Sequence, residues 1–323
     1  MLRRALALAL GALVSPLPAF ADEGGLSFWV PGQYASFAAS QTDPGWSVEF
    51  QSYVSQGRQA SGTVSAAKGG VRVDGRTLTQ DVFYVTPGYT IDGKVLGGQL
   101  YFGATLGYEW LDNKVGTVVS RPGRRDTVTT ETNVDEAGWG TVDINPLVTL
   151  KWEFGVDNLM TYLTGNIPSG YFQANTISTP GLGFWAIDGG LGYTYYDSKR
   201  GLEFSMVAGA TYNFENPYSW QSGVDGHLDV GASYAIADPF YVGAVGYFFK
   251  QLSGDVGAPT DLAAHLSRVG GAGPQLGWSF QTGNIEIDVN VRGYAEFAAE
   301  NRPQGYAAWF TVTLQQIKPK SQK

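Results

Sequence analysis

The chain contains two histidines, His227 and His265, and hydrolysis of the Ser-His-Asp type would depend on one of them. In that chemistry the histidine is a general base and must lie within hydrogen-bond distance of the nucleophile. His227 stands two residues before Asp229, and on a strand the two side chains would be about 7 Å apart along one face. That spacing seldom gives a close pair, and no motif marks a serine nucleophile.

The composition excludes several further kinds of site and partner. The chain has no Cys, which excludes disulfides, thiolate–zinc sites and iron–sulfur clusters, and two separated histidines make a weak metal site. It carries 21 Lys+Arg against 29 Asp+Glu without basic clusters, so nucleic acid is not expected as a partner. We expect no catalytic residues, no metal and no cofactor; an active site of aspartates in exposed loops is the enzymatic alternative.

The first 21 residues have the pattern of a cleavable signal peptide. Arg3 and Arg4 precede the apolar run Ala5–Val14, and Ala19-Phe20-Ala21 supplies a cleavage site. The run is shorter than the roughly 20 apolar residues that cross a bilayer. We therefore expect an exported protein that begins near Asp22.

The remaining sequence is rich in glycine and aromatic residues, with 44 Gly, 18 Tyr, 17 Phe and 9 Trp in the whole chain. No later segment is a continuous apolar stretch of the length that a membrane helix needs. Apolar side chains can nevertheless meet lipid if they all lie on one face of a sheet. Only a closed barrel allows this while satisfying every backbone hydrogen bond.

Alternation of apolar and polar residues predicts such strands. In Val142–Phe154, Ile144, Val148 and Leu150 share one face, while Asp143, Lys151 and Glu153 share the other. Pro146 on the apolar face requires a bulge or kink, because proline cannot donate to a sheet. The predicted strands form an even-numbered set: Trp46–Val54, Asp81–Ile91, Leu96–Trp110, Val142–Phe154, Leu159–Ile167, Trp185–Tyr195, Leu202–Phe214, His227–Ile236, Phe240–Phe249, Gln275–Phe280, Asn284–Val291 and Tyr306–Leu314.

The connections between these strands are alternately long and short. Long extracellular loops and short periplasmic turns are typical of outer-membrane barrels. The expected loops include Ser55–Thr79, Leu111–Ala137, Pro168–Phe184, Glu215–Gly226 and Leu252–Pro274, and glycine-rich Val269–Gly273 is interpreted as part of the last. We predict an all-β, antiparallel transmembrane barrel of about twelve strands over residues 45–314, with both termini in the periplasm and residues 315–323 as a periplasmic tail.

The same alternation predicts which side chains line the lumen. Most of these polar groups are expected to be structural, as hydrated or paired charges. The alternative is a lining that selects permeants, in which Lys151 and Arg292 are local cation sites. The candidates that contact the lumen or a permeant are Glu49, Tyr53, Tyr101, Asp143, Lys151, Glu153, His227, Asp229, Glu286, Asp288 and Arg292.

Residues 22–44, between the cleavage site and the first strand, are too long for a simple tail. Their aromatic side chains Phe28, Trp29, Tyr34 and Phe37 would be costly to leave in water. We therefore hypothesise that the segment folds back into the lumen as a plug. A periplasmic cap below the barrel is the alternative.

Short glycine- and aromatic-rich motifs resemble one known family. They are Gly25–Gly32, Pro44–Ser47, Pro146–Trp152, Gly181–Trp185, Gly201–Phe204, His227–Asp229 and Glu300–Pro303. Together they resemble the outer-membrane "meta-pathway of phenol degradation" transporters, also called SphA-like proteins. Gly165–Tyr171 departs from the expected Pro-Thr-Gly of that family. The resemblance implies a Gram-negative outer-membrane channel whose relatives accompany pathways for aromatic or hydrophobic compounds.

The expected function is therefore uptake of small hydrophobic or aromatic compounds. A structural or adhesive barrel without transport, and an outer-membrane hydrolase, are the alternatives. Expected partners are outer-membrane lipid and lipopolysaccharide, the permeant, and the periplasmic chaperones and barrel-assembly machinery that act during insertion. Conductance across a planar bilayer separates a channel from a barrel filled by its own side chains.

Overall fold

The computed structural model describes residues 26–59, 62–66, 69–122, 127–173, 176–257 and 266–317. The expected signal peptide, His265 and residues 318–323 of the expected tail lie outside this part. Over these ranges, no helix has the length and apolarity to cross a membrane. Every regular element described is a strand: β1 (Gly45–Gln59), β2 (Gly62–Ala66), β3 (Gly69–Thr90), β4 (Gln99–Pro122), β5 (Thr127–Thr141), β6 (Asn145–Phe154), β7 (Asp157–Asn166), β8 (Ala186–Asp197), β9 (Leu202–Asn213), β10 (Asp225–Ala237), β11 (Phe240–Gln251), β12 (Arg268–Thr282), β13 (Ile285–Glu300) and β14 (Gln304–Gln316).

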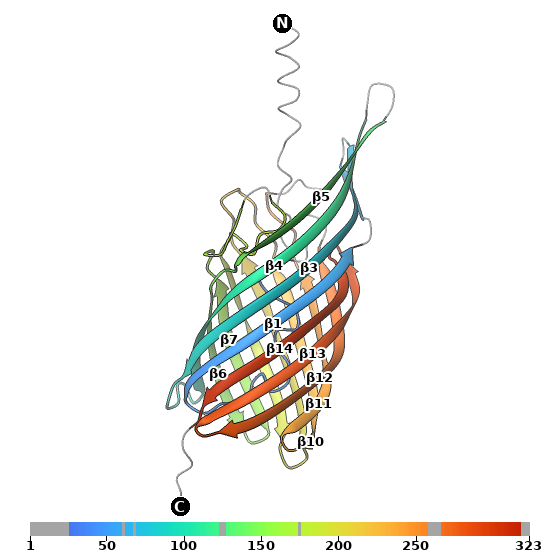
Figure 1. Ribbon diagram of the computed structural model, residues 1–323. Coiled ribbons are helices and arrows are strands. Elements are labelled where there is room, and N and C mark those ends of the chain that lie inside the picture. Colours follow the sequence, from blue (N-terminus) through green and yellow to red (C-terminus); the bar gives the residue numbers. More distant parts are fainter. Residues whose placement is uncertain are drawn as a thin grey trace, which may run out of the picture.

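Twelve of these strands form a closed antiparallel barrel (Figure 1). The ring runs β3-β1-β14 and then down the strand numbers to β6 and β4, and pairing of β4 with β3 closes it. β2 pairs with β3 alone and β5 with β4 alone, so both lie outside the ring. Each predicted strand corresponds to one strand of the ring, which confirms the predicted barrel.

The barrel places apolar side chains outside and polar side chains inside. On β9, Glu203, Ser205 and Thr211 are buried and face the interior. Their neighbours Phe204, Met206 and Tyr212 are 40–46% exposed on the outer surface. This arrangement is the reverse of a soluble barrel and is suited to a lipid environment.

Long and short connections lie at opposite ends of the barrel. The short-turn end holds the connections after β3, β6, β8, β10 and β12, whereas the long-loop end holds those after β7, β9 and β11. β1 starts beside the end of β14, where Ser47 pairs with Gln315, and β1 rises to Arg58 beside Gln304. The predicted sorting of the connections is therefore confirmed.

Two predicted loops are wrong, because strands continue through them. Within Ser55–Thr79, β1 extends to Gln59 and β3 begins at Gly69; within Leu111–Ala137, β4 extends to Pro122 and β5 begins at Thr127. β3, β4 and β5 together rise beyond the rest of the barrel (Figure 1). These segments lack a sustained apolar face in the sequence, so alternation gave no signal, although Thr and Val favour strands.

The interpretation of Val269–Gly273 as a loop is also wrong, because this stretch belongs to β12. A Cβ at Gly270 would lie 2.7 Å from the ring of Phe297, and one at Gly271 would lie 2.4 Å from the ring of Tyr247. The glycines therefore make room for aromatic rings of the neighbouring strands.

Pro146 is the second residue of β6, where it lies opposite Ala104 of β4. The start of a strand tolerates proline.

Candidate functional site

Residues 26–44 run through the barrel from one end to the other. At the long-loop end, the Ser27 hydroxyl accepts hydrogen bonds from Arg302, which lies in the turn between β13 and β14. At the short-turn end, Gln315 donates to the carbonyl of Asp43 over 2.9 Å. The chain must therefore cross the lumen before it enters β1. As a consequence, residues 26 and 317 lie at opposite ends of the barrel, whereas the expectation for the mature chain put both termini on one side.

The middle of this segment is held by an acidic and a basic side chain, which we call the backbone clamp (Asp229 and Arg292). Asp229 of β10 accepts the backbone N–H groups of Gly32 and Tyr34, each over 3.1 Å. Arg292 of β13 donates from Nε to the carbonyl of Gly32 over 3.1 Å and from Nη2 to that of Gln33 over 2.9 Å. Both side chains belong to residues that are at most 4% exposed. The clamp therefore binds backbone atoms through charge-assisted hydrogen bonds.

Residues 37–40, which follow towards the short-turn end, are held by the barrel wall in the same way. Glu203 accepts the N–H of Phe37 over 2.9 Å, and Thr194 accepts that of Ala39 over 3.0 Å. Lys151 of β6 donates to the carbonyl of Ser40 over 2.9 Å. A buried segment without regular secondary structure needs partners for its backbone N–H and carbonyl groups. Here a carboxylate and a hydroxyl of the wall accept the N–H groups, and the Lys151 ammonium donates to a carbonyl.

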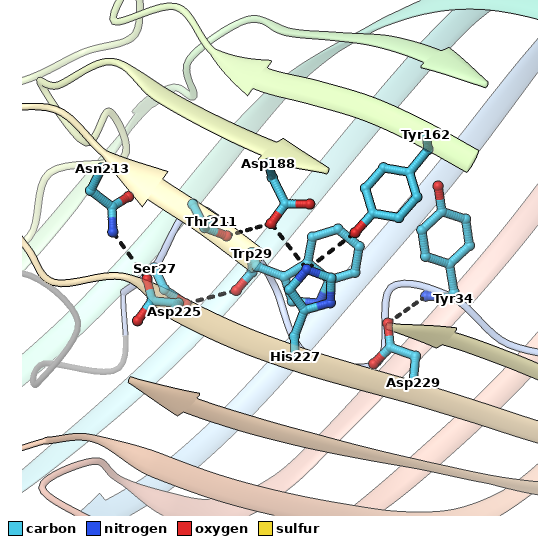
Figure 2. A network of polar contacts seen from close by, with 10 residues as sticks. All are labelled: Ser27, Trp29, Tyr34, Tyr162, Asp188, Thr211, Asn213, Asp225, His227 and Asp229. Carbon is cyan, nitrogen blue, oxygen red and sulfur yellow. Dashed lines mark hydrogen bonds and ion pairs between the residues drawn. The ribbon is translucent and has the colours of Figure 1, made fainter. Parts of the chain in front are cut away.

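His227 of β10 packs against this segment from the barrel wall. Figure 2 shows the imidazole stacked on Trp29, with ring centroids 3.5 Å apart and 12° between the planes. Its Nε2 is 3.0 Å from Asp188 Oδ2 and 3.2 Å from the Tyr162 hydroxyl. Asp188, rather than Asp229, is therefore the carboxylate beside the imidazole, and no serine hydroxyl bonds to His227 in the described part of the chain. Through its stacking on Trp29, His227 is therefore one of the wall residues that hold residues 26–44 in place.

The structure brings together only some of the other predicted lumen residues. Tyr53 contacts Trp309 with ring centroids 4.6 Å apart, Glu49 accepts from Thr313, and the Tyr101 ring lies over Gly88 and Gly103. Glu153, Glu286 and Asp288 belong to the short-turn ends of β6 and β13 and lie away from the clamp, Glu153 and Asp288 being exposed. Contact of these lumen candidates with a permeant stays a prediction.

Sequence reasoning missed two inward aromatic side chains. Tyr162 is 4% exposed and contacts Trp29, with ring centroids 5.9 Å apart. Trp309 is 1% exposed and its Nε1 donates to the carbonyl of Pro31 over 3.4 Å. The signal that could have placed such side chains inside is their spacing from polar inward neighbours, since Trp309 lies two residues before the buried Thr311 on β14.

Two cavities lie between the described residues 26–44 and the wall, which is formed here by β1, β3, β4, β6, β7 and β14. The first has a volume of ≈ 60 Å³ near the long-loop end, and its lining includes Phe28, Tyr53 and Leu182. The second has a volume of ≈ 50 Å³, and its lining includes the rings of Trp29, Tyr34 and Trp309 together with polar side chains such as Gln51. A cavity of about 150 Å³ holds a benzene molecule. Neither cavity therefore holds an aromatic ring unless residues 26–44 move.

Asp143 binds both described parts, residues 168–173 and 176–184, of the connection between β7 and β8. Its Oδ1 accepts the N–H of Gly170 over 2.8 Å, and its Oδ2 accepts the N–H of Leu182 over 2.9 Å and the amide of Asn166 over 2.7 Å. Leu182 and Asp143 both line the first cavity. One carboxylate thus joins both ends of the loop to the barrel wall.

Replacement Asp143→Ala is expected to free this loop without unfolding the barrel. Loss of hydrogen bonds to a buried carboxylate costs about 2–4 kcal/mol locally, so protease cleavage within residues 168–184 should become at least about tenfold faster. Asp81→Asn on the exposed outer face of β3 is the matched control. Cleavage of the folded variant at the wild-type rate would contradict the assignment of Asp143.

A family model matches the chain over residues 56–312, which is most of its length. The description of that family is "Putative MetA-pathway of phenol degradation". The chain belongs to this family. The resemblance that the sequence motifs indicated is thereby confirmed, and the match extends over the barrel strands rather than over residues 26–44.

Three solved structures were compared with this member of the phenol-degradation family, and the first of them shares its fold. The COG4313 outer membrane channel from Pseudomonas putida F1 is 13% identical with a TM-score of 0.57, over 89% of this chain and 100% of the other. The transport unit of the autotransporter AIDA-I from Escherichia coli is 11% identical, with a TM-score of 0.40 over 87% and 92%. The CymD monoaromatic hydrocarbon channel is 9% identical, with a TM-score of 0.36 over 89% and 95%. No curated protein matches the chain.

Proposed function

We propose that this protein is an outer-membrane channel for the uptake of small hydrophobic or aromatic compounds, in which residues 26–44 are a lumenal plug. In this proposal the apolar outer face meets lipid and lipopolysaccharide, and the long-loop end faces the exterior. Periplasmic chaperones and the barrel-assembly machinery act during insertion, as for other barrels of this kind. No catalytic residue is required.

The observation that carries the proposal is the chemistry of the two cavities beside the plug. The deeper cavity is lined by rings from both the plug and the wall together with polar side chains such as Gln51 and Asn145, whereas the first cavity combines rings with charged side chains that include Glu109 and Asp143. Phe28 and Tyr84 line both cavities, and Trp309 lines the deeper one. Aromatic faces bind aromatic ligands through stacked and edge-to-face contacts, and apolar pockets with a few polar groups are typical small-molecule sites.

The manner of plug attachment also supports uptake rather than a purely structural barrel. A permanently filled barrel needs only its own wall side chains, as in narrow barrels. Here the filling is a separate segment, whose N–H and carbonyl groups bond to Asp229, Glu203 and Arg292. Hydrogen bonds of this kind can be exchanged for bonds to water or ligand without changing the strand pairing.

Uptake of phenol tests the proposal. Vesicles with lipopolysaccharide in the outer leaflet resist hydrophobic solutes, so facilitated entry is measurable above the background. We expect phenol to enter vesicles that contain the full-length mature protein several-fold faster than protein-free vesicles, while glucose entry is accelerated much less. Equal phenol rates with and without protein would overturn the proposed uptake and favour a structural barrel.

A further inference from the structure

The guanidinium of Arg292 presents two different edges. Its Nη1 donates to Asn290 Oδ1 over 2.8 Å and to Thr311 Oγ1 over 3.2 Å, so one edge is held by neutral groups of the wall. The other edge, formed by Nε and Nη2, faces the plug and donates to two consecutive carbonyls. The wall thus fixes the orientation of the guanidinium, and the carbonyls of the plug occupy its Nε–Nη2 edge.

No Asp or Glu oxygen of the described residues forms an ion pair with this buried cation within 4.0 Å, and the charges of Glu49 and Asp229 act on it from a greater distance. The acidic groups of the neighbouring wall are engaged elsewhere. Asp229 accepts the N–H groups of Gly32 and Tyr34, and Glu49 accepts the hydroxyl of Thr313. A buried guanidinium bonded only to neutral acceptors is less stable than one paired with a carboxylate.

The Nε–Nη2 edge of a guanidinium has the geometry that binds both oxygens of one carboxylate. The carbonyl oxygens of Gly32 and Gln33 occupy that position and act as stand-ins for the two carboxylate oxygens. Arg292 also lies over the Trp309 ring, with 5.2 Å from Cζ to the ring centroid. Gln33 and Trp309 both contact Arg292 and both line the deeper cavity, so this cavity adjoins the Nε–Nη2 edge of Arg292.

We propose that the Nε–Nη2 edge of Arg292 binds the carboxylate of an aromatic or other hydrophobic monocarboxylate, which displaces the plug carbonyls and loosens the plug. The inference deepens the proposed function, because the site lies beside the proposed permeation path. The hydrophobic part of the ligand enters the aromatic cavity, which enlarges as Trp29 and Tyr34 move away with the plug. Ligand binding and plug seating therefore exclude each other at this one side chain.

A single cysteine reports plug seating cleanly, because the chain has no native Cys. Ser36 belongs to the plug and accepts a hydrogen bond from Gln275 over 2.6 Å. In the full-length mature Ser36→Cys protein, benzoate above neutral pH should accelerate thiol labelling about tenfold, the effect of one charge-assisted bidentate contact. Benzamide, and sodium chloride at the same ionic strength, should not.

Two further variants separate ligand binding from general loosening of the plug. Arg292→Gln should raise the basal labelling rate and abolish the response to benzoate. Lys151→Gln, which also removes a cation bonded to a plug carbonyl, should raise the basal rate and retain the response. An undiminished benzoate response in Arg292→Gln, or an equal response to benzamide, would overturn the inference. Because labelling reports binding, a protein that responds to benzoate but does not admit phenol would refute only the proposed uptake.

Discussion

Deletion of residues 23–43 is expected to raise the single-channel conductance of the barrel on the order of tenfold, because a twelve-stranded barrel without its filling leaves an aqueous lumen. The residues removed include all the plug atoms that bond to Asp229, Glu203 and Arg292. β1 begins at Gly45, beyond the deletion, so the strand ring keeps every pairing. The measurement is conductance in planar bilayers with the wild-type protein beside it.

The matched control for the deletion is removal of residues 318–323, which shortens the other end of the chain. That variant should conduct like the wild type. Far-ultraviolet circular dichroism and the heat-dependent shift in gel mobility establish that each barrel is folded. A folded deletion variant with wild-type conductance would show that residues 26–44 do not obstruct the lumen.

Replacement Gly231→Leu should open the channel while leaving the plug sequence intact. Gly231 lies on β10 between Ser205 and Val245, and a Cβ at this position would be 2.7 Å from the backbone nitrogen of Ser36. The nearest atoms belong to the plug backbone, which cannot yield by changing a rotamer. The plug must therefore move away. Overpacking of this kind costs about 1–3 kcal/mol, which raises the unseated population between about 5-fold and 150-fold.

Gly293→Leu is the matched control, because a Cβ at Gly293 meets no atom within 4 Å. Both substitutions place the same side chain on a barrel strand, but only that at Gly231 meets the plug. We expect a several-fold rise in conductance for Gly231→Leu and none for Gly293→Leu. Equal conductance of the two folded variants would contradict the close packing of the plug on β10.

The barrel could be predicted from the sequence because lipid and lumen impose opposite demands on alternate residues. β9 illustrates this, since Phe204 and Met206 face outward while Glu203 and Ser205 face inward. The extension formed by β3, β4 and β5 was missed because those segments carry no sustained apolar face. Alternation reports burial, and a strand without one apolar face gives no such signal.

The candidate site was only partly accessible from the sequence. Composition predicted that the rings of Phe28 and Trp29 need burial, and the inward positions of Asp229 and Arg292 followed from strand alternation. What sequence could not supply is the pairing of these two charges with one stretch of backbone, because β10 and β13 are not neighbours in the ring. Likewise, the partner of His227 is Asp188 on β8, which no local spacing indicates.

Reversible locking of the plug tests the central claim most directly. In Ser36→Cys/Gln275→Cys, the two cysteines replace side chains that are in hydrogen-bond contact, and a short, reducible bifunctional thiol reagent can bridge them. We predict that bridging lowers phenol entry into lipopolysaccharide-containing vesicles to the protein-free rate, that reduction restores it, and that neither single-cysteine variant responds. Phenol entry at the same rate in the bridged and reduced protein would contradict the claim that plug movement admits the permeant.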